Sequence, residues 1–352
     1  MSIEILDVFK QDAFNAVSLS NAVNDITPTY GRLGALGIFT QEGVTQRTVA
    51  VDFDPITNAL VPQSQWGGPG TANKSALSKS KSFQIPHFAM NDLMLAADLQ
   101  GRRRPGSDMV QDMQYVTAKK MRELRVKLEQ QQEWMRLGVL RSGQVKDGAG
   151  NLILDIYSDF GISQIATGFA LGTSTTDVMG KIAAVKRNII NALRGEMITG
   201  FLAICSDSFY DAFVSHANVK AAFTYFQNNN GQNLSQDYSG GSAPAGQVRG
   251  FTFGGNELPV TWINYTGTVP DSSGSAQALV DTDSAYMLPL GTSVFKEFYA
   301  PADYIETVNT DGLPFYAKQE RMKYDKGIEL ECQSNPLPIC LKPACVQQLT
   351  KT

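Results

Sequence analysis

Four side chains near the middle of the chain could together perform hydrolysis. Ser206, Asp207 and Ser208 precede His216, one of two histidines in the sequence. A histidine base within reach of a hydroxyl is the geometric basis of a Ser-His-Asp triad. The same residues also fit a helix that begins after a Ser-Asp cap and carries His216 at its C-terminal end, where a cation is favoured. We favour the capping interpretation and keep a hydrolase or ligand-binding protein as an alternative function.

The other motifs with chemical potential favour structural roles. Glu329 and Glu331 are two residues apart on a predicted strand, so both point to solvent and neither is half-buried, as acid–base catalysis requires. The glycine-rich run at 67–70 precedes no helix, and Pro69 has no N–H for a phosphate. His87 has no second ligand nearby, and the four cysteines form no C-x-x-C pair. We predict no catalytic residue, no cofactor and no metal site.

Several side chains instead suit contacts between protein surfaces. The three consecutive arginines at 102–104 are either a solvated linker or a site for carboxylates of a neighbouring subunit, which Arg binds bidentately. DNA phosphates are a third, weaker alternative, because the rest of the chain is acidic. Trp66 is either a loop hydrophobe or an interface anchor. The candidates for inter-subunit contacts are Trp66, Phe83, Arg102, Arg103, Arg104 and Glu329.

Residues 107–141 must position much of the chain, because they read as one α-helix about 50 Å long. Asp108 can cap its start, and Gly143 follows its end in a place that suits a left-handed stop. The spacing of its apolar residues predicts one buried stripe, made of Val110, Met113, Met121, Leu124, Leu128, Met135 and Val139. Pairs four residues apart, such as Arg125 with Glu129, are expected to add a few tenths of a kcal/mol each, and Arg136 to complement the helix dipole.

Residues 43–90 predict a long hairpin that is polar on both faces. A projecting two-stranded hairpin of this kind is not stable alone in water, so it should lie on a partner, most simply another copy of the chain. Before this hairpin, a helix is expected over 5–24. The three glycines within 30–39 then predict an extended arm. After it, residues 91–100 are expected to form a short helix.

The remainder alternates helix and strand. Residues 144–155 predict a hairpin, 176–194 a helix, and 201–205 a strand buried on both faces. This order indicates an α+β chain with a central sheet covered by helices. Residues 227–247, rich in Gly, Ser and Asn, predict an exposed loop. Shorter strands are expected at 250–253, 259–264, 278–281 and 285–288, and a β-rich segment at 315–349.

Composition and charge agree with a folded protein. The chain has 352 residues, 43% of them apolar, and a net charge of −4. Residues 101–141 contain ten Lys and Arg and five Asp and Glu. One basic segment in an otherwise acidic chain does not indicate a general nucleic-acid-binding protein. No apolar run reaches the length of a membrane span and no signal pattern begins the chain, so a cytoplasmic protein with reduced thiols and no membrane partner is expected.

The order of these motifs resembles the major capsid proteins of tailed bacteriophages with the Hong Kong 97 fold, and within them the lambda-type major capsid protein E family. The resemblance rests on motifs spread over nearly the whole chain: YGRLG at 30–34, IF at 38–39, IPHF at 85–88, the segment 91–102, the region 143–155, NTDGLP at 309–314 and QSNPLP at 333–338.

The resemblance implies an N-arm at 1–42, an extended E-loop hairpin at 43–90, a P-domain at 91–160 with the spine helix 107–141, an α/β A-domain at 161–307, and C-terminal P-domain strands at 308–352. It implies a non-enzymatic shell of hexamers and pentamers around double-stranded DNA, which is held by weak non-specific contacts. The implied partners are a scaffolding protein, a portal and a decoration protein. The expected location is the virion capsid, and the host cytoplasm during assembly. The loops at 227–247 and 264–275 would meet at capsomer centres. An encapsulin-like compartment remains an alternative within the same fold.

Overall fold

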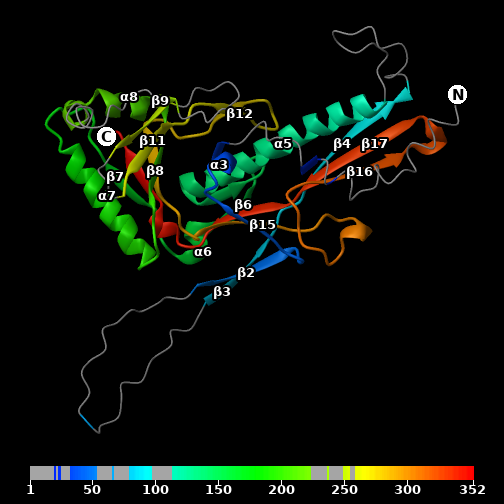
Figure 1. The fold of residues 1–352 in the computed structure, drawn as a ribbon, viewed down its shortest axis with the longest axis horizontal. Helices are drawn as coiled ribbons and strands as arrows, with labels where there is room; N and C mark the ends of the chain where they lie inside the picture. Colours follow the sequence, from blue (N-terminus) through cyan, green and yellow to red (C-terminus); the bar gives the residue numbers. More distant parts are fainter. Residues whose placement is uncertain are drawn as a thin grey trace.

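One helix dominates the computed structural model, which describes residues 20, 23–24, 32–53, 66, 79–96, 113–222, 236–237, 249–253 and 258–352. This helix, α5 (Met113–Ser142), is about 45 Å long and runs from the large sheet at one end of the molecule to a smaller sheet at the other (Figure 1). The predicted long helix is confirmed for these residues. Residues 107–112, including the predicted cap Asp108, lie outside the described residues.

The apolar stripe of α5 contributes to two separate cores. Towards its N-terminus, Met121, Leu124 and Leu128 are buried in the smaller core. Towards its C-terminus, Met135 and Val139 belong to the larger one. The helix ends at Gly143, which has the predicted left-handed conformation (φ 64°). A single helix that enters both cores fixes their relative position.

The larger core surrounds a seven-stranded mixed sheet. Its strands are, in spatial order, β7 (Ile165–Gly168), β19 (Gln347–Thr350), β14 (Ser284–Leu290), β8 (Gly200–Cys205), β11 (Val260–Asn264), β10 (Arg249–Phe253) and β9 (Gln236–Asp237). Every residue of β8 is buried, as predicted for a strand covered on both faces. β19 pairs in parallel with β7 and antiparallel with β14, so it lies inside the sheet.

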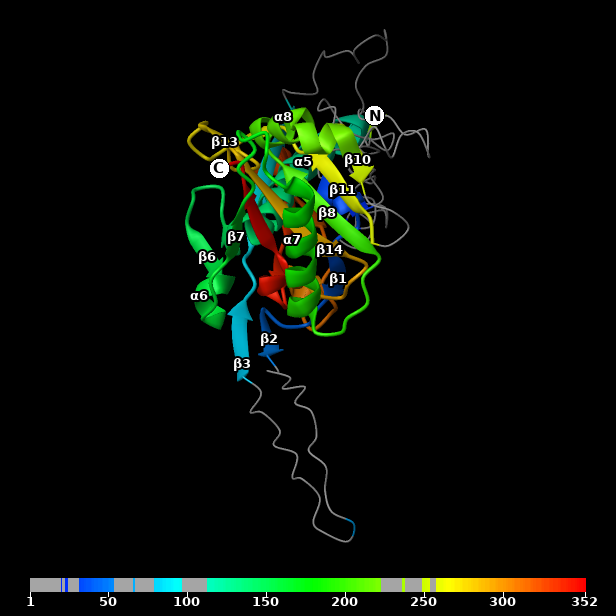
Figure 2. The same cartoon turned by 90° about the vertical axis from the view of Figure 1, so that its left-hand side faces the viewer.

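Helices cover this sheet as predicted. Helix α7 (Val178–Leu193) lies on one side of it, and the C-terminal part of α5 lies on the other (Figures 1 and 2). Helix α8 (Asp207–Ser215) packs on β14 and β11. Its Phe213 ring stacks on Trp262, with 4.1 Å between the ring centroids. Aromatic stacking of this kind adds to the stabilisation from burial.

The predicted strand at 278–281 is displaced. The structure has a hairpin of β12 (Thr268–Pro270) and β13 (Ala276–Ala278) instead. Leu279 and Val280 follow this hairpin outside regular structure, and both side chains are buried in the larger core. β12 falls inside the loop predicted at 264–275. β9 is the only part of the 227–247 stretch that lies among the described residues.

The smaller core lies between the N-terminal half of α5 and a three-stranded sheet. This sheet has the order β16 (Tyr316–Arg321), β17 (Gly327–Ser334) and β4 (Phe88–Leu95). The predicted helix at 91–100 is therefore wrong for residues 91–95. Met94 is buried between Leu93 and Leu95, which are exposed, so the segment follows the period of two of a strand. Eight antiparallel pairings with β17 override its helix propensity.

A third sheet packs on the larger core, in the order β1 (Thr40–Gly43), β15 (Phe295–Tyr299) and β18 (Pro336–Cys340). Just before it, the predicted extended arm is wrong at α3 (Arg32–Ala35), which is a helical turn packed on α5. Leu33 is completely buried there. Gly34 permits the approach, because a Cβ at this position would lie 2.7 Å from Nη1 of Arg136. In the helix predicted at 5–24, only residues 20, 23 and 24 are described, and all three are helical.

The remaining described elements include two hairpins, four short helices and a helical segment at 217–222. β2 (Thr48–Phe53) and β3 (Lys79–Gln84) form the base of the long hairpin predicted at 43–90. That base is not polar on both faces, because Val49, Val51 and Phe83 are buried in the larger core. β5 (Gln144–Lys146) and β6 (Leu152–Asp155) confirm the hairpin predicted at 144–155. The short helices are α6 (Ile156–Phe160), η2 (Ile305–Thr307), η3 (Lys323–Asp325) and η4 (Pro343–Cys345).

Candidate functional site

The residues that could have formed a triad are held apart by structural hydrogen bonds. The Ser206 hydroxyl accepts the backbone N–H of Phe209 at 3.4 Å, which confirms it as the cap of α8. Nε2 of the buried His216 lies 3.0 Å from the carbonyl oxygen of Thr173. The Ser208 hydroxyl accepts a backbone N–H from a neighbouring turn. The capping interpretation is therefore confirmed. Among the described residues, no group of His, Cys, Asp and Glu could hold a metal ion.

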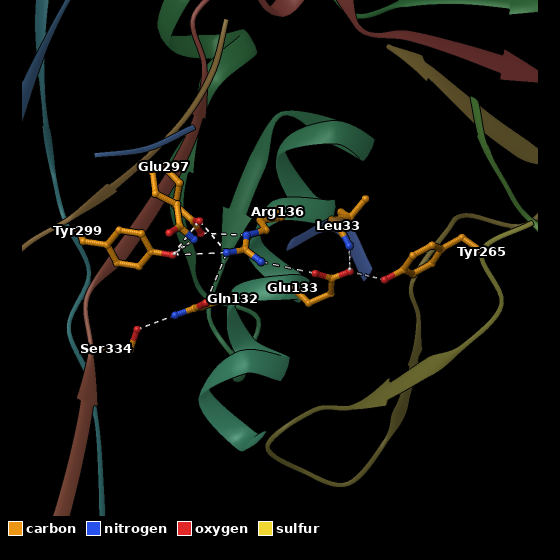
Figure 3. A network of polar contacts seen from close by, with 9 residues as sticks. Leu33, Gln132, Glu133, Arg136, Tyr265, Glu297, Tyr299 and Ser334 are labelled. Carbon is orange, nitrogen blue, oxygen red and sulfur yellow. Dashed lines mark hydrogen bonds and ion pairs between the residues drawn. The ribbon is translucent and has the colours of Figure 1, made fainter. Parts of the chain in front are cut away.

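The most developed polar site instead lies along α5, deep inside the chain (Figure 3). Arg136 faces Glu297 of β15 with both arms of its guanidinium: Nη2 lies 2.7 Å from Oε2, and Nε lies 3.0 Å from Oε1. This bidentate pair is the strongest geometry available to the two groups. Tyr299 is two residues further along β15 and therefore on the same face, and its hydroxyl donates to Glu297 at 2.8 Å.

A second carboxylate, Glu133, lies one helical turn before Arg136 and is completely buried. Its Oε1 accepts the backbone N–H of Leu33 at 2.9 Å and the hydroxyl of Tyr265. Its Oε2 has no hydrogen-bond partner and lies 3.8 Å from Nη1 of Arg136. Glu133 thus connects α5 to the turn α3 and to the segment after β11.

The network also reaches the second and third sheets. Gln132 donates to the hydroxyl of Ser334 at 2.8 Å and accepts from Arg136 at 3.5 Å. Ser334 in turn donates to the carbonyl oxygen of Pro314 at 2.7 Å. Figure 3 shows these side chains converging on α5 from separate strands and loops. The arrangement cross-links elements that are far apart in sequence, and this is a structural task.

Burial sets the protonation states of the network. The site holds two carboxylates and one guanidinium. Burial is the largest influence on the pKa of Glu133 and raises it above its ordinary value, although hydrogen bonds from Leu33 and Tyr265 act in the opposite direction. Burial is the largest influence on the pKa of Arg136 and acts to lower it, but the charge and hydrogen bond of Glu297, together with Tyr299 and Glu133, make the net shift upward. Burial and the same charge raise the pKa of Tyr299, so its hydroxyl remains a donor.

The sequence of α5 alone does not predict this network. The sequence predicts only a helix-dipole role for Arg136 and a weak four-residue pair for Arg125 with Glu129, yet all three side chains are buried. Nε of Arg125 lies 2.6 Å from Oε1 of Glu129, and its guanidinium is 4.8 Å from the centre of the Phe315 ring. One local sign of a buried polar site is present in the sequence: the apolar stripe of α5 is interrupted between Leu128 and Met135 by a glutamine at 131 or 132. A polar residue at a core position needs buried partners.

The charge state of Glu133 leads to a prediction about pH. Its pKa is higher in the folded chain than its ordinary value of 4.5, so above pH 4.5 the folded chain binds more protons than the unfolded chain. The contribution of this residue to the free energy of unfolding therefore falls as the pH rises. Glu133→Gln keeps the acceptor for Leu33 and Tyr265 and removes the titration. We expect its free energy of unfolding to improve relative to wild type between pH 4.5 and 7, measured by chemical denaturation.

Glu123→Gln is the matched control, because Glu123 is exposed on the same helix and forms only a surface pair at 3.9 Å with Lys119. Its difference from wild type should stay flat over the same pH range. A difference for Glu133→Gln that does not change with pH would mean that folding leaves the pKa of Glu133 at its ordinary value.

The predicted contact residues fall into three groups. Trp66 is fully exposed, and Glu329 is exposed on β17. Phe83 is only 6% exposed and packs edge to face on Phe160, at 6.1 Å between the ring centroids. Little of its surface is left for a neighbour, and its role in a subunit contact stays a prediction. The three arginines at 102–104 lie outside the described residues.

Comparison with known proteins identifies the family. Residues 15–351 match the family model described as phage major capsid protein E. The chain belongs to this family. It is 26% identical over 344 residues to the major capsid protein of Pseudomonas phage KPP10, with 96% of each chain covered. It is 25% identical over 356 residues to that of Salmonella phage Felix O1, with 95% of each covered.

Solved structures support the same fold. A putative capsid protein of a prophage of Escherichia coli CFT073 superposes with a TM-score of 0.58 at 14% identity, covering 96% of this chain and 99% of the other. A phage-related protein of Bordetella bronchiseptica RB50 gives a TM-score of 0.51 at 9% identity, covering 97% and 98%.

This phage major capsid protein forms the head shell and has the predicted α+β, Hong Kong 97-type fold. The compartment and hydrolase alternatives are not favoured. None of the described helices is long and apolar enough to cross a membrane.

Proposed function

We propose that this capsid protein assembles as hexamers and pentamers through an N-arm at 1–42, an extended loop at 43–90, a P-domain at 91–160 and 308–352, and an A-domain at 161–307. In this proposal the extended loop of one subunit crosses the P-domain sheet of its neighbour. The subunit then acts through surfaces rather than through a catalytic centre. The structural hydrogen bonds of Ser206, Ser208 and His216 support this view.

The observation that carries the proposal is the outer face of the sheet β16–β17–β4. Glu320 and Glu329 lie directly opposite each other in this sheet, and both are exposed. Like charges in this position destabilise a sheet. Among the described residues, neither has a cation within ion-pair distance. Leu93, opposite Glu329 on β4, is also exposed. The face therefore combines an unbalanced acidic pair with uncovered apolar surface.

The extended loop has the complementary charge. Residues 55–80 contain two charged residues, Lys74 and Lys79, and no carboxylate. Laid across a neighbouring sheet, these lysines would neutralise the acidic pair, and Trp66 would be available as an apolar anchor. Because each subunit both gives a loop and receives one, the contact is heterologous and can close into rings.

We further propose that the subunits assemble in the host cytoplasm, guided by a scaffolding protein and a portal. A decoration protein would then bind the assembled shell. The packaged double-stranded DNA would make weak, non-specific contacts. The basic run at 102–104 is available for a neighbour's carboxylates or for phosphate.

Glu329→Lys tests the loop contact. It is expected to lower the yield of shells seen by electron microscopy, most strongly at low salt, because it opposes the incoming lysines. The isolated subunit should melt as wild type or slightly higher, since the change removes the repulsion from Glu320. Glu123→Lys, an exposed reversal on α5, is the control and should assemble normally. Wild-type yields of Glu329→Lys shells at every salt concentration would contradict the contact.

A further inference from the structure

Two exposed aliphatic side chains project from the loop between β15 and β16. Ile305 is 91% exposed and Val308 is 62% exposed, and both belong to or border the turn η2. Single exposed apolar residues are common on protein surfaces and need no explanation. Two of them on one turn, this far out of the core, form a small apolar knob, which we define as Ile305 and Val308.

Hydrogen bonds and one ion pair fix the loop that carries this knob. The Thr307 hydroxyl donates to the carbonyl oxygens of Ala302 and Tyr304, at 2.8 and 3.0 Å. The Tyr304 hydroxyl donates to Glu331 at 3.2 Å. Lys318 reaches Glu306, between the two knob residues, at 3.1 Å. A knob held in place by such bonds loses little conformational entropy when it docks.

A cavity of about 370 Å³ lies nearby, where the base of the long hairpin meets the hairpin β5–β6. Its apolar wall is formed by Phe83, Ile85, Pro86, Ile153, Leu154 and Pro301. Its rim is polar. On that rim Nδ1 of His87 and Oδ1 of Asn335 lie 2.9 Å apart, and Asp303 accepts a hydrogen bond from Gln333 at 2.5 Å. The exposure of the knob shows that it does not fill the cavity of its own subunit.

One rim residue is left without a counter-charge. Arg47 lines the cavity and is exposed. Across the described part of the chain, no carboxylate lies within ion-pair distance of its guanidinium. The knob carries a carboxylate, because Glu306 lies between Ile305 and Val308; it pairs with Lys318 in its own subunit, but half of its side chain stays exposed. An apolar knob next to a carboxylate thus matches an apolar cavity next to a guanidinium.

We propose that the knob of one subunit docks in the cavity of a second copy, with Glu306 pairing with Arg47 of that copy. The shape and charge of the two patches support this occupant. Since the patches differ, each subunit can give one knob and receive one, which is the condition for a closed ring of copies. This contact goes beyond the loop contact proposed above and shares none of its charged residues.

A cross-link between single variants tests the proposal directly. Subunits with Ile305→Cys and subunits with Gln84→Cys, an exposed residue that also lines the cavity, are mixed under conditions in which the unmodified full-length chain forms shells. The four native cysteines are buried, which limits background reaction. A mild oxidant should then give disulfide-linked dimers in the mixed shells and none in shells of either variant alone. Mixed shells without dimers, or dimers of Ile305→Cys alone, would overturn the docking.

A charge swap gives an independent readout. Glu306→Arg and Arg47→Glu should each lower shell yield by roughly tenfold or more, since one unfavourable contact is repeated over the whole shell. The double variant should recover most of the yield. Arg47→Glu should melt as wild type, whereas the chains with Glu306→Arg lose the exposed ion pair with Lys318 and should melt slightly lower. Full yield from either single variant, or no recovery in the double variant, would contradict the pairing. These results are independent of Glu329, so failure of the loop contact remains distinguishable.

Discussion

Arg136→Ala is expected to lower the free energy of unfolding by about 3–5 kcal/mol, because it leaves the buried carboxylate of Glu297 without its cation. The hydroxyl of Tyr299 would remain as a donor, but one neutral hydrogen bond does not replace a bidentate ion pair. This loss is a large fraction of the stability of an ordinary domain, which is about 5–15 kcal/mol. Thermal and chemical denaturation of the purified subunit would measure the loss, and little soluble protein is expected at 37 °C.

Two further variants separate the ion pair from the packing around it. Arg136→Met with Glu297→Leu removes both charges and keeps much of the volume, so it should recover a large part of the loss. Lys119→Ala removes an exposed partner on the same helix and should cost less than about 0.5 kcal/mol. If Arg136→Ala were as mild as Lys119→Ala, the buried network would not hold the elements together.

Replacing residues 54–78 with an Asn-Gly turn is expected to give a folded subunit that forms no shells. Phe53 and Lys79 are paired in the β2–β3 ladder, so a two-residue turn can close the hairpin at that point. The buried base, including Val49 and Phe83, stays in the larger core. Size-exclusion chromatography should show small species with near wild-type melting, and electron microscopy should show no closed particles.

The matched control is Trp66→Ala in the full-length loop, which removes one exposed side chain and should weaken assembly without abolishing it. Full-size shells from the shortened chain would refute the proposed loop contact, whereas loss of folding would mean that the hairpin base needs residues beyond Phe53.

Periodic, locally determined elements could be predicted from the sequence, whereas elements decided by distant partners could not. The apolar stripe of α5, the buried strand β8 and the Ser206 cap each depend on neighbours within one or two turns. The strand and the cap are confirmed, and the stripe is confirmed from Met121 to Val139. Residues 91–95 have helix-forming composition, but β17, more than 230 positions later in the chain, pairs with them as a strand. No local pattern contains that information.

The buried network was hidden for a related reason. Glu133 and Arg136 are ordinary helix-surface residues by type, and their partners, Glu297 and Tyr265, come from segments more than 130 residues away. Burial of a charge depends on which elements cover it, so it appears only once the three sheets are placed. Polar interruptions of an otherwise apolar stripe are the local sign of such a site, and they are worth examining in similar helices.

The position of β19 has a consequence for synthesis of the subunit. This strand completes the seven-stranded sheet between β7 and β14, yet it is translated after every other strand of that sheet. At 5–20 residues per second, roughly 3–11 s separate the end of β14 from the start of β19 on the ribosome. Through that interval the edges of β7 and β14 lack their shared neighbour. A nascent chain therefore cannot present a finished subunit surface, which delays association with other copies until translation has passed residue 350.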